Sequence, residues 1–226
     1  MQKSLRVAYR RYLAVAISVF ILIGLVQDLR ATEREPLHIL LTNDDGFDAP
    51  GIRAVYDVLV AAGHNVTLIA PLSNQSGSGL RITTSGVLDF TEQSAGIWSV
   101  DGSPADSVLV GLIYHLKDAD SVDLVISGAN FGQNLGYTGG SGTVAAATIA
   151  MYLGIPAIAV SVGLDISERD AVPVRFPSTL NAFAGAADLT LTIVDDLQRS
   201  AINTGNLLPA HTMLNVNYPA VSTEEL

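Results

Sequence analysis

The chain has 226 residues, of which 49% are hydrophobic and 15% are charged, so it carries enough apolar surface for a folded core and is not intrinsically disordered. It contains no cysteine, which excludes a disulfide scaffold, a thiolate zinc site, an iron–sulfur cluster and a cysteine nucleophile. Its formal net charge of −10 at pH 7 excludes the basic surface that a nucleic-acid duplex requires, so a bound phosphate would need a metal ion or backbone N–H groups.

The first 31 residues differ in composition from the rest of the chain. Basic residues, including Arg10 and Arg11, precede an apolar run from Leu13 to Val26. As a helix this run would rise about 21 Å, less than the hydrocarbon core of a membrane, which is about 30 Å thick. This arrangement is typical of an export signal, with an uncleaved membrane anchor as the alternative. We therefore expect a periplasmic, extracellular or membrane-anchored protein, with a cytoplasmic one as the alternative, and a folded domain over residues 32–226.

From residue 37 onward, short apolar runs that predict strands alternate with longer runs that predict helices. The predicted strands are residues 37–42, 65–70, 122–126, 156–161 and 212–216, with a small hairpin within 81–101. The predicted helices are residues 50–62, 104–117, 143–153 and 178–197. Strands separated by helices of this length need right-handed crossovers within a mostly parallel sheet. The sequence thus predicts an α/β fold, a doubly wound sheet flanked by helices.

Oxygen-bearing side chains follow the first three predicted strands at their carboxyl ends, where open parallel sheets bind ligands. Asp44 and Asp45 follow the first strand, and the loops after the next two strands carry Ser73, Asn74, Ser76 and Asn130. Adjacent carboxylates repel each other unless a cation lies between them, and oxygen ligands suit Mg²⁺, Mn²⁺ or Ca²⁺. Asp and Gly are also typical of a plain turn, but the oxygen donors at the other strand ends favour a metal site.

A glycine-rich segment, Gly139-Gly140-Ser141-Gly142-Thr143, opens the third predicted helix. Glycines let the backbone approach a ligand closely, and free N–H groups at a helix start bind anions. An ordinary Ser or Thr cap after a flexible loop is the alternative. The position one loop after Asn130 favours a phosphate site beside the metal, an arrangement suited to a metal-assisted phosphoester hydrolase. Asp106 lies in the first turn of its helix, where a carboxylate interacts favourably with the helix dipole whether or not it also binds a ligand.

Five motifs, in this order along residues 37–219, resemble the SurE family (survival protein E) of metal-dependent 5′/3′-nucleotidases. They are residues 43–46 with 49–52, 70–71 with 74–77, 127–136, 141–147 and 215–219. The resemblance implies that Asp44, Asp45, Ser76 and Asn130 hold a divalent metal ion, Mg²⁺ or Mn²⁺, with Asp44, Asp45 and Asn130 catalytic. It implies that the substrate and its phosphate are bound by Asn43, Asn134, Ser141, Gly142, Thr143 and Asp106.

The resemblance implies a metal-dependent phosphomonoesterase that hydrolyses nucleoside 5′- or 3′-monophosphates. The alternative is a non-catalytic receiver-like or metal-binding module. A receiver needs a phospho-accepting Asp after the third strand and a Lys after a later one, whereas this chain has Asn130 and only the lysines Lys3 and Lys117. Family members usually have an aromatic residue directly before Ser-Gly-Thr and a C-terminal tail that helps to form a dimer. We expect a homodimer where such a tail is present.

Overall fold

The structure is a computed structural model that describes residues 35–117, 122–170, 173 and 175–221. The predicted export signal or anchor, residues 1–31, lies outside the described residues. Within the described part of the chain, no helix combines the length and the apolar composition needed to cross a bilayer.

Seven strands form a single sheet in the order β3-β4-β2-β1-β5-β6-β7. Their bounds are β1 His38–Thr42, β2 Asn65–Pro71, β3 Phe90–Ser94, β4 Ile97–Val100, β5 Leu124–Phe131, β6 Ala157–Val162 and β7 Met213–Tyr218. All neighbouring strands are parallel except β3 and β4, which form the predicted hairpin. The predicted α/β fold with a mostly parallel sheet is therefore confirmed.

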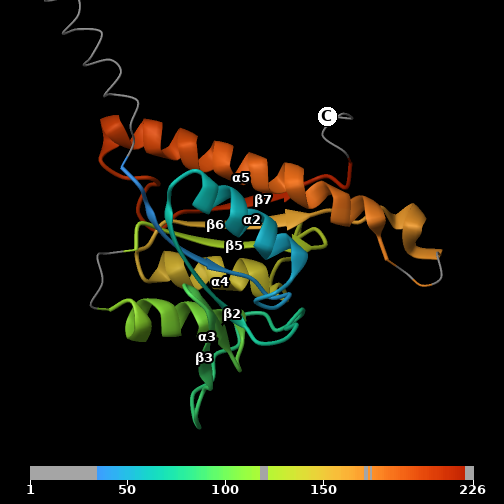
Figure 1. The fold of residues 1–226 in the computed structure, drawn as a ribbon, viewed down its shortest axis with the longest axis horizontal. Coiled ribbons are helices and arrows are strands. Elements are labelled where there is room, and N and C mark those ends of the chain that lie inside the picture. The colour runs from blue at the N-terminus through green and yellow to red at the C-terminus, as the bar shows by residue number, and fades with distance from the viewer. Residues whose placement is uncertain (1–34, 118–121, 171–172, 174, 222–226) are drawn as a thin grey trace, which may run out of the picture. The chain divides into compact units, whose positions relative to one another are not determined.

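Helices cover both faces of the sheet (Figure 1). Helices α2 (Pro50–Ala61) and α5 (Pro177–Thr204) pack together on one face, and α3 (Pro104–Leu109) and α4 (Gly142–Tyr152) pack on the other. Successive residues of a strand point to opposite faces, so Leu41 packs under α2 and α5 whereas Leu40 packs under α3 and α4. Both faces of β1 are thus buried, which explains its continuous apolar sequence.

Strand β5 is longer than the sequence predicts. The prediction ended this strand at Ile126 and assigned Ser127 onward to a loop, but β5 continues to Phe131. The pairing with β6 shifts between Ser127 and Asn130. Gly128 lies so close to β6 that a Cβ atom there would be 2.2 Å from the carbonyl oxygen of Val160. The extension places Asn130 within the sheet, beyond the carboxyl end of β1, instead of in the predicted loop.

Two helices also depart from their predicted bounds. The helix predicted to reach residue 117 is α-helical only to Leu109 and continues as a π-helical segment, η1, over Val110–His115. The His115 ring at its end lies 4.5 Å from the Trp98 ring, centroid to centroid, which joins this segment to the hairpin. Helix α5 extends beyond the predicted residue 197 to Thr204, and Gly205 ends it in a left-handed conformation with φ of 76°.

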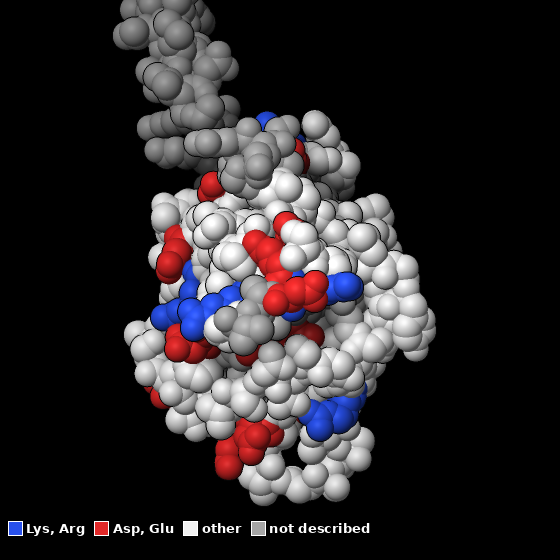
Figure 2. Space-filling view, turned by 90° about the vertical axis from the view of Figure 1, so that its right-hand side faces the viewer, with Lys and Arg blue, Asp and Glu red and all other residues white. Residues whose placement is uncertain are grey.

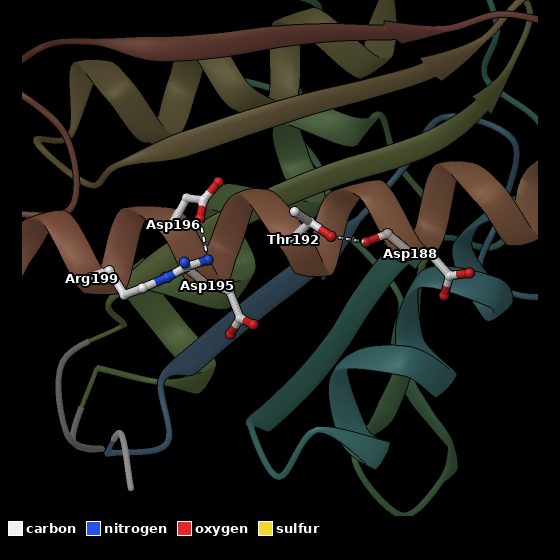
Figure 3. A network of polar contacts seen from close by, with 5 residues as sticks. All are labelled: Asp188, Thr192, Asp195, Asp196 and Arg199. Atoms are coloured by element: carbon white, nitrogen blue, oxygen red, sulfur yellow. Dashed lines mark hydrogen bonds and ion pairs between the residues drawn. The ribbon is translucent and has the colours of Figure 1, made fainter. Parts of the chain in front are cut away.

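The solvent-facing side of α5 carries short-range polar contacts (Figure 3). The Thr192 hydroxyl donates a hydrogen bond of 2.9 Å to the carbonyl of Asp188, one turn earlier. Arg199 forms an ion pair with Asp196 and donates to the carbonyl of Asp195. Exposed pairs of this kind contribute little stability, so the apolar face of α5, which packs on the sheet and on α2, holds the helix in place.

Candidate metal and phosphate site

The turn after β1 is held together by Asn43. Its amide nitrogen donates to the carbonyl of Gly46 (2.9 Å), and its amide oxygen accepts from the N–H of Gly46 (3.1 Å). Both ends of the buried Asn43 amide are therefore engaged within the turn. This brace fixes the backbone of Asp44 and Asp45, which lie between the two bonded residues. A direct contact of Asn43 with phosphate stays a prediction.

Asp44 lies against the first turn of α4 and is 2% exposed. Its Oδ1 accepts a 2.7 Å hydrogen bond from the Thr143 hydroxyl. Burial raises the pKa of Asp44, although hydrogen bonds from Thr143 and Gly142 act in the opposite direction. A Cβ atom on Gly142 would lie 2.8 Å from the Cβ of Asp44, so this approach requires glycine. The start of α4, where we expected a phosphate, thus holds the Asp44 carboxylate, and phosphate binding by Gly142 and Thr143 stays a prediction.

Asp45 reaches across to the end of β5. Its Oδ2 accepts a 2.8 Å hydrogen bond from the N–H of Phe131, and its Oδ1 accepts one of 3.3 Å from the Asn74 side chain. The pKa of Asp45 is raised to about 6. Burial is the largest cause, the hydrogen bond from Phe131 acts in the opposite direction, and the nearby charge of Asp44 adds to the increase. The two carboxylates are therefore held close together in an environment that penalises their negative charge.

Ser76 and Asn130 complete the predicted set of metal ligands. Ser76 lies in the loop after β2, where its N–H donates to the Asn74 side chain (2.9 Å), and the preceding residue, Gln75, donates its N–H to the carbonyl of Asp44 (2.7 Å). Asn130 is 8% exposed, and its amide nitrogen donates to the carbonyl of Gly132 (2.7 Å). That bond identifies which of the two terminal side-chain atoms is the nitrogen. The amide oxygen of Asn130 then accepts no hydrogen bond from the described residues.

The turn after β1, the loop after β2, the end of β5 and the loop before α4 line a cavity of about 300 Å³. Three predicted metal ligands line it, Asp44, Ser76 and Asn130, with two predicted phosphate-binding residues, Asn134 and Ser141. The other lining residues are Gly77, Phe131, Gly132, Gln133, Tyr137 and Gly140. No Lys or Arg is among these lining residues. Asp45 is not among these lining residues, and its carboxylate is bonded to Phe131, which is one of them, and to Asn74. The cavity size falls at the lower end of the range for small-molecule sites.

Asn134 is held in the cavity wall by the two last strands of the sheet. Its N–H donates to the side chain of Asn217 (2.8 Å), and its amide nitrogen donates to the Ser161 hydroxyl (2.9 Å). The Asn215 side chain donates to the Asn134 carbonyl (2.9 Å). The motif Asn215-Val216-Asn217 thus acts as a support for Asn134, a function that the sequence pattern alone did not indicate.

Asp106 lies outside the lining of the cavity. Its carboxylate accepts hydrogen bonds from the N–H and hydroxyl of Thr83 (2.8 and 3.0 Å) and from the N–H of Ser103 (2.8 Å). Burial acts to raise the pKa of Asp106, but these hydrogen bonds outweigh it and lower the pKa. Asp106 therefore caps α3 and fastens the segment after the Ser76 loop to that helix. A role in binding substrate stays a prediction.

The donor set fits a hard divalent cation. Among the described residues no three His, Cys, Asp or Glu side chains are grouped as metal ligands, so any cation needs the amide and hydroxyl oxygens as well. The buried Ser78 hydroxyl oxygen has no hydrogen-bond partner within the described structure, and it lies 2.8 Å from the position that a Cβ on Gly142 would occupy, as the Asp44 carboxylate does at 2.9 Å. Oxygen atoms of this kind are the ligands that Mg²⁺ and Mn²⁺ prefer.

The molecular surface on the side where the β6 arrow ends in Figure 1 carries mixed charge (Figure 2). Acidic and basic atoms lie side by side in the middle of this view, and the rest of the face is mainly uncharged. On this face, the described residues form no continuous basic patch. A phosphate ester reaching the cavity would therefore gain little from surface charge, and its negative charge must be balanced inside the site.

Sequence reasoning missed part of the cavity wall. Phe131, Gln133 and Tyr137 line it but were not assigned a role. Phe131 and Gln133 lie within the motif that ends β5, so their distance from Asn130 along the chain was a usable signal. Tyr137 is an aromatic residue in a glycine-rich loop, and its exposure could not be predicted from hydrophobic periodicity.

Comparison with known proteins identifies relatives over most of the chain. Residues 39–226 match the family described as Survival protein SurE. Proteins named 5′-nucleotidase SurE from Geobacter sulfurreducens and Methylococcus capsulatus are 41% and 37% identical over 194 residues, which is 84% of this chain and 65% and 67% of theirs. The crystal structure of the SurE protein from Aquifex aeolicus is 34% identical, with a TM-score of 0.70, and the match covers 83% of this chain and 68% of that one. The chain spans about two thirds of the length of these relatives.

Proposed function

The chain belongs to the SurE family, and on this basis we propose that it is a divalent-cation-dependent phosphomonoesterase that hydrolyses nucleoside 5′- or 3′-monophosphates. The observation that carries the proposal is the pair Asp44 and Asp45, two neighbouring carboxylates with raised pKa values at a cavity that no Lys or Arg lines. A cation relieves the repulsion between them and offsets the charge of a phosphate. The relatives named 5′-nucleotidase support the choice of substrate.

The residues of the cavity have distinct proposed roles. Asp44, Asp45, Ser76 and Asn130 hold the cation. When bound, it supplies positive charge that polarises the phosphoryl group and makes water a better nucleophile at neutral pH. Thr143 fixes the orientation of Asp44, and Phe131 that of Asp45, through hydrogen bonds of 2.7 and 2.8 Å. Because these bonds exist before any ligand arrives, little reorganisation is needed when the cation binds.

Two further residues of the cavity lining hold the phosphate of the substrate. Ser141 and Asn134 line the cavity, and the bonds to Asn217 and Ser161 keep Asn134 from turning away. The positive end of the α4 dipole is shared between the Asp44 carboxylate and whatever anion enters beside Ser141. Asn43 and Asp106 act on the substrate indirectly, by fixing the turn after β1 and the loop beside α3.

Phosphate release from a panel of 5′- and 3′-nucleoside monophosphates tests this function. The assay is run with Mg²⁺, with Mn²⁺ and with EDTA. We expect release with at least one of the two cations and none with EDTA, and restored release when the cation is returned in excess. Release that continues in EDTA contradicts the role of the cation, and no release from any nucleotide with either cation contradicts the proposed substrate class.

The cellular setting is a separate proposal. We propose that residues 1–31 direct export or anchor the protein in a membrane, and that residues 32–226 form the catalytic domain, which becomes a homodimer where a family-like tail is present. The basic and apolar segments of the N-terminus support the first part. Fractionation of cells that express the whole chain tests it, and a full-length soluble cytoplasmic product is the contrary result.

A further inference from the structure

Tyr137 lines the cavity, but it belongs neither to the proposed metal ligands nor to the proposed phosphate-binding residues. It is 92% exposed, which is unusual for an aromatic residue that lies in a wall of the cavity. One side of its ring lies against Gly139, where a Cβ atom would be 2.8 Å from the ring Cζ and from the hydroxyl oxygen. The ring therefore rests on the backbone of its own loop, and the rest of its surface is open to solvent.

The loop that carries Tyr137 is fixed by two backbone hydrogen bonds directly after this residue. The N–H of Ser141 donates to the carbonyl of Thr138 (3.0 Å), which closes the turn before α4. The N–H of Gly79 donates to the carbonyl of Gly140 (3.1 Å), which ties the same turn to the loop that carries Ser76. These bonds fix the backbone between Tyr137 and Ser141, two residues that line the same cavity as Asp44.

A nucleotide has a base at one end and a phosphate at the other. The exposed Tyr137 ring suits the base, and the proposed phosphate site in the same cavity suits the phosphate. Stacking of a base on an aromatic side chain contributes about 1–3 kcal/mol and tolerates any base, because every base has a π-face. The cavity lining has no Lys or Arg, and its one carboxylate, Asp44, is assigned to the cation, so no lining charge is left to recognise a base by a salt bridge. Resting on the proposed phosphatase function, we propose that Tyr137 is the platform on which the base of a nucleoside monophosphate stacks while its phosphate lies between Asp44 and Ser141.

Two substrates separate this role from a general effect on the site. AMP carries a base, and ribose 5-phosphate presents the same phosphate and sugar without one. We expect Tyr137→Ala to lower kcat/KM for AMP on the order of tenfold, mainly through KM, and to leave ribose 5-phosphate within about twofold. Tyr137→Phe keeps the ring and should behave as the wild type. Leu135→Ala is the matched control, since Leu135 lies on the same loop and is 67% exposed but does not line the cavity.

Titration calorimetry with adenosine and with inorganic phosphate, both in Mn²⁺, gives a second readout that needs no turnover. Weaker adenosine binding by Tyr137→Ala with unchanged phosphate binding supports the platform, even where the wild type releases no phosphate and the proposed function fails. Equal losses for AMP and ribose 5-phosphate overturn the platform while the phosphatase function stands. Unchanged adenosine binding by Tyr137→Ala, or no adenosine binding by the wild type, also overturns it.

Discussion

Replacing Asp45 by asparagine should stabilise the metal-free protein while abolishing its response to Mn²⁺. Asparagine has nearly the same shape as aspartate and keeps an oxygen that can accept the hydrogen bond from Phe131. The pKa of Asp45 is raised from 3.8 to about 6, and a shift of about two units corresponds to about 3 kcal/mol against the charged form at neutral pH. The new amide N–H₂ faces the donor of Asn74, which costs about 1 kcal/mol. The net gain is therefore about 2 kcal/mol.

The sign of this effect depends on pH. Between pH 4 and 6 the folded protein holds the Asp45 proton more tightly than the unfolded chain, so the wild type loses stability as the pH rises through this interval. The gain from Asp45→Asn should thus be full above pH 6 and absent below about pH 4. Mn²⁺ at 100 times its dissociation constant adds about 2.7 kcal/mol to the wild type only.

Urea unfolding in EDTA at pH 7.5 and pH 4, followed by the same experiment with Mn²⁺, measures both effects. Asp48→Asn is the matched control, because Asp48 lies three residues away with a 77% exposed side chain. Equal or lower stability of Asp45→Asn than of the wild type at pH 7.5 in EDTA would show that the Asp45 charge does not destabilise the metal-free protein. Equal stabilisation of both proteins by Mn²⁺ would show that Asp45 does not hold the cation.

The remaining predictions concern the groups that position the site. Gly142→Ala should lose about 1–3 kcal/mol of stability and most of its Mn²⁺ affinity, because its Cβ overlaps Asp44, whereas Gly140→Ala has open space and should change neither in urea unfolding and calorimetry. Asp106→Ala should lose about 1–3 kcal/mol at pH 7, and since its pKa is lowered, the difference from the wild type should shrink as the pH falls below 4. Asn217→Ala frees the N–H of Asn134 and should lower kcat/KM in the phosphate assay with Mn²⁺ affinity unchanged.

Much of the fold follows from local sequence patterns. The strand β1 was predictable because its run of apolar residues is buried on both faces and ends directly at Asp44-Asp45-Gly46. The extension of β5 was not, because Ser127 to Asn130 are small or polar residues whose burial comes from β6, a strand that lies some thirty residues later in the chain. Hydrophobic periodicity reflects only residues close together in the sequence, so it cannot predict such a contact.

The same division holds for the site. The residues at the carboxyl ends of the strands were predictable, since parallel strands end at one edge of the sheet. Their partners were not: the hydrogen bond between Asp44 and Thr143 joins residues 99 positions apart. For this reason the start of α4 was expected to face a phosphate, although part of it holds Asp44. The exposure of Tyr137 depends in the same way on the bond between its loop and Gly79, and on the contact of its ring with Gly139 in the same loop.

Phosphate release from AMP in Mn²⁺ by the wild type, Asp45→Ala and Asp48→Ala shows whether activity depends on the cation held at Asp45, because both substitutions remove one carboxylate from the same short segment. Calorimetry with Mn²⁺ on the same three proteins shows whether any loss of activity follows a loss of the cation. We expect the wild type and Asp48→Ala to bind Mn²⁺ and release phosphate, and Asp45→Ala to fold but do neither. Wild-type turnover and Mn²⁺ binding by Asp45→Ala would contradict this expectation.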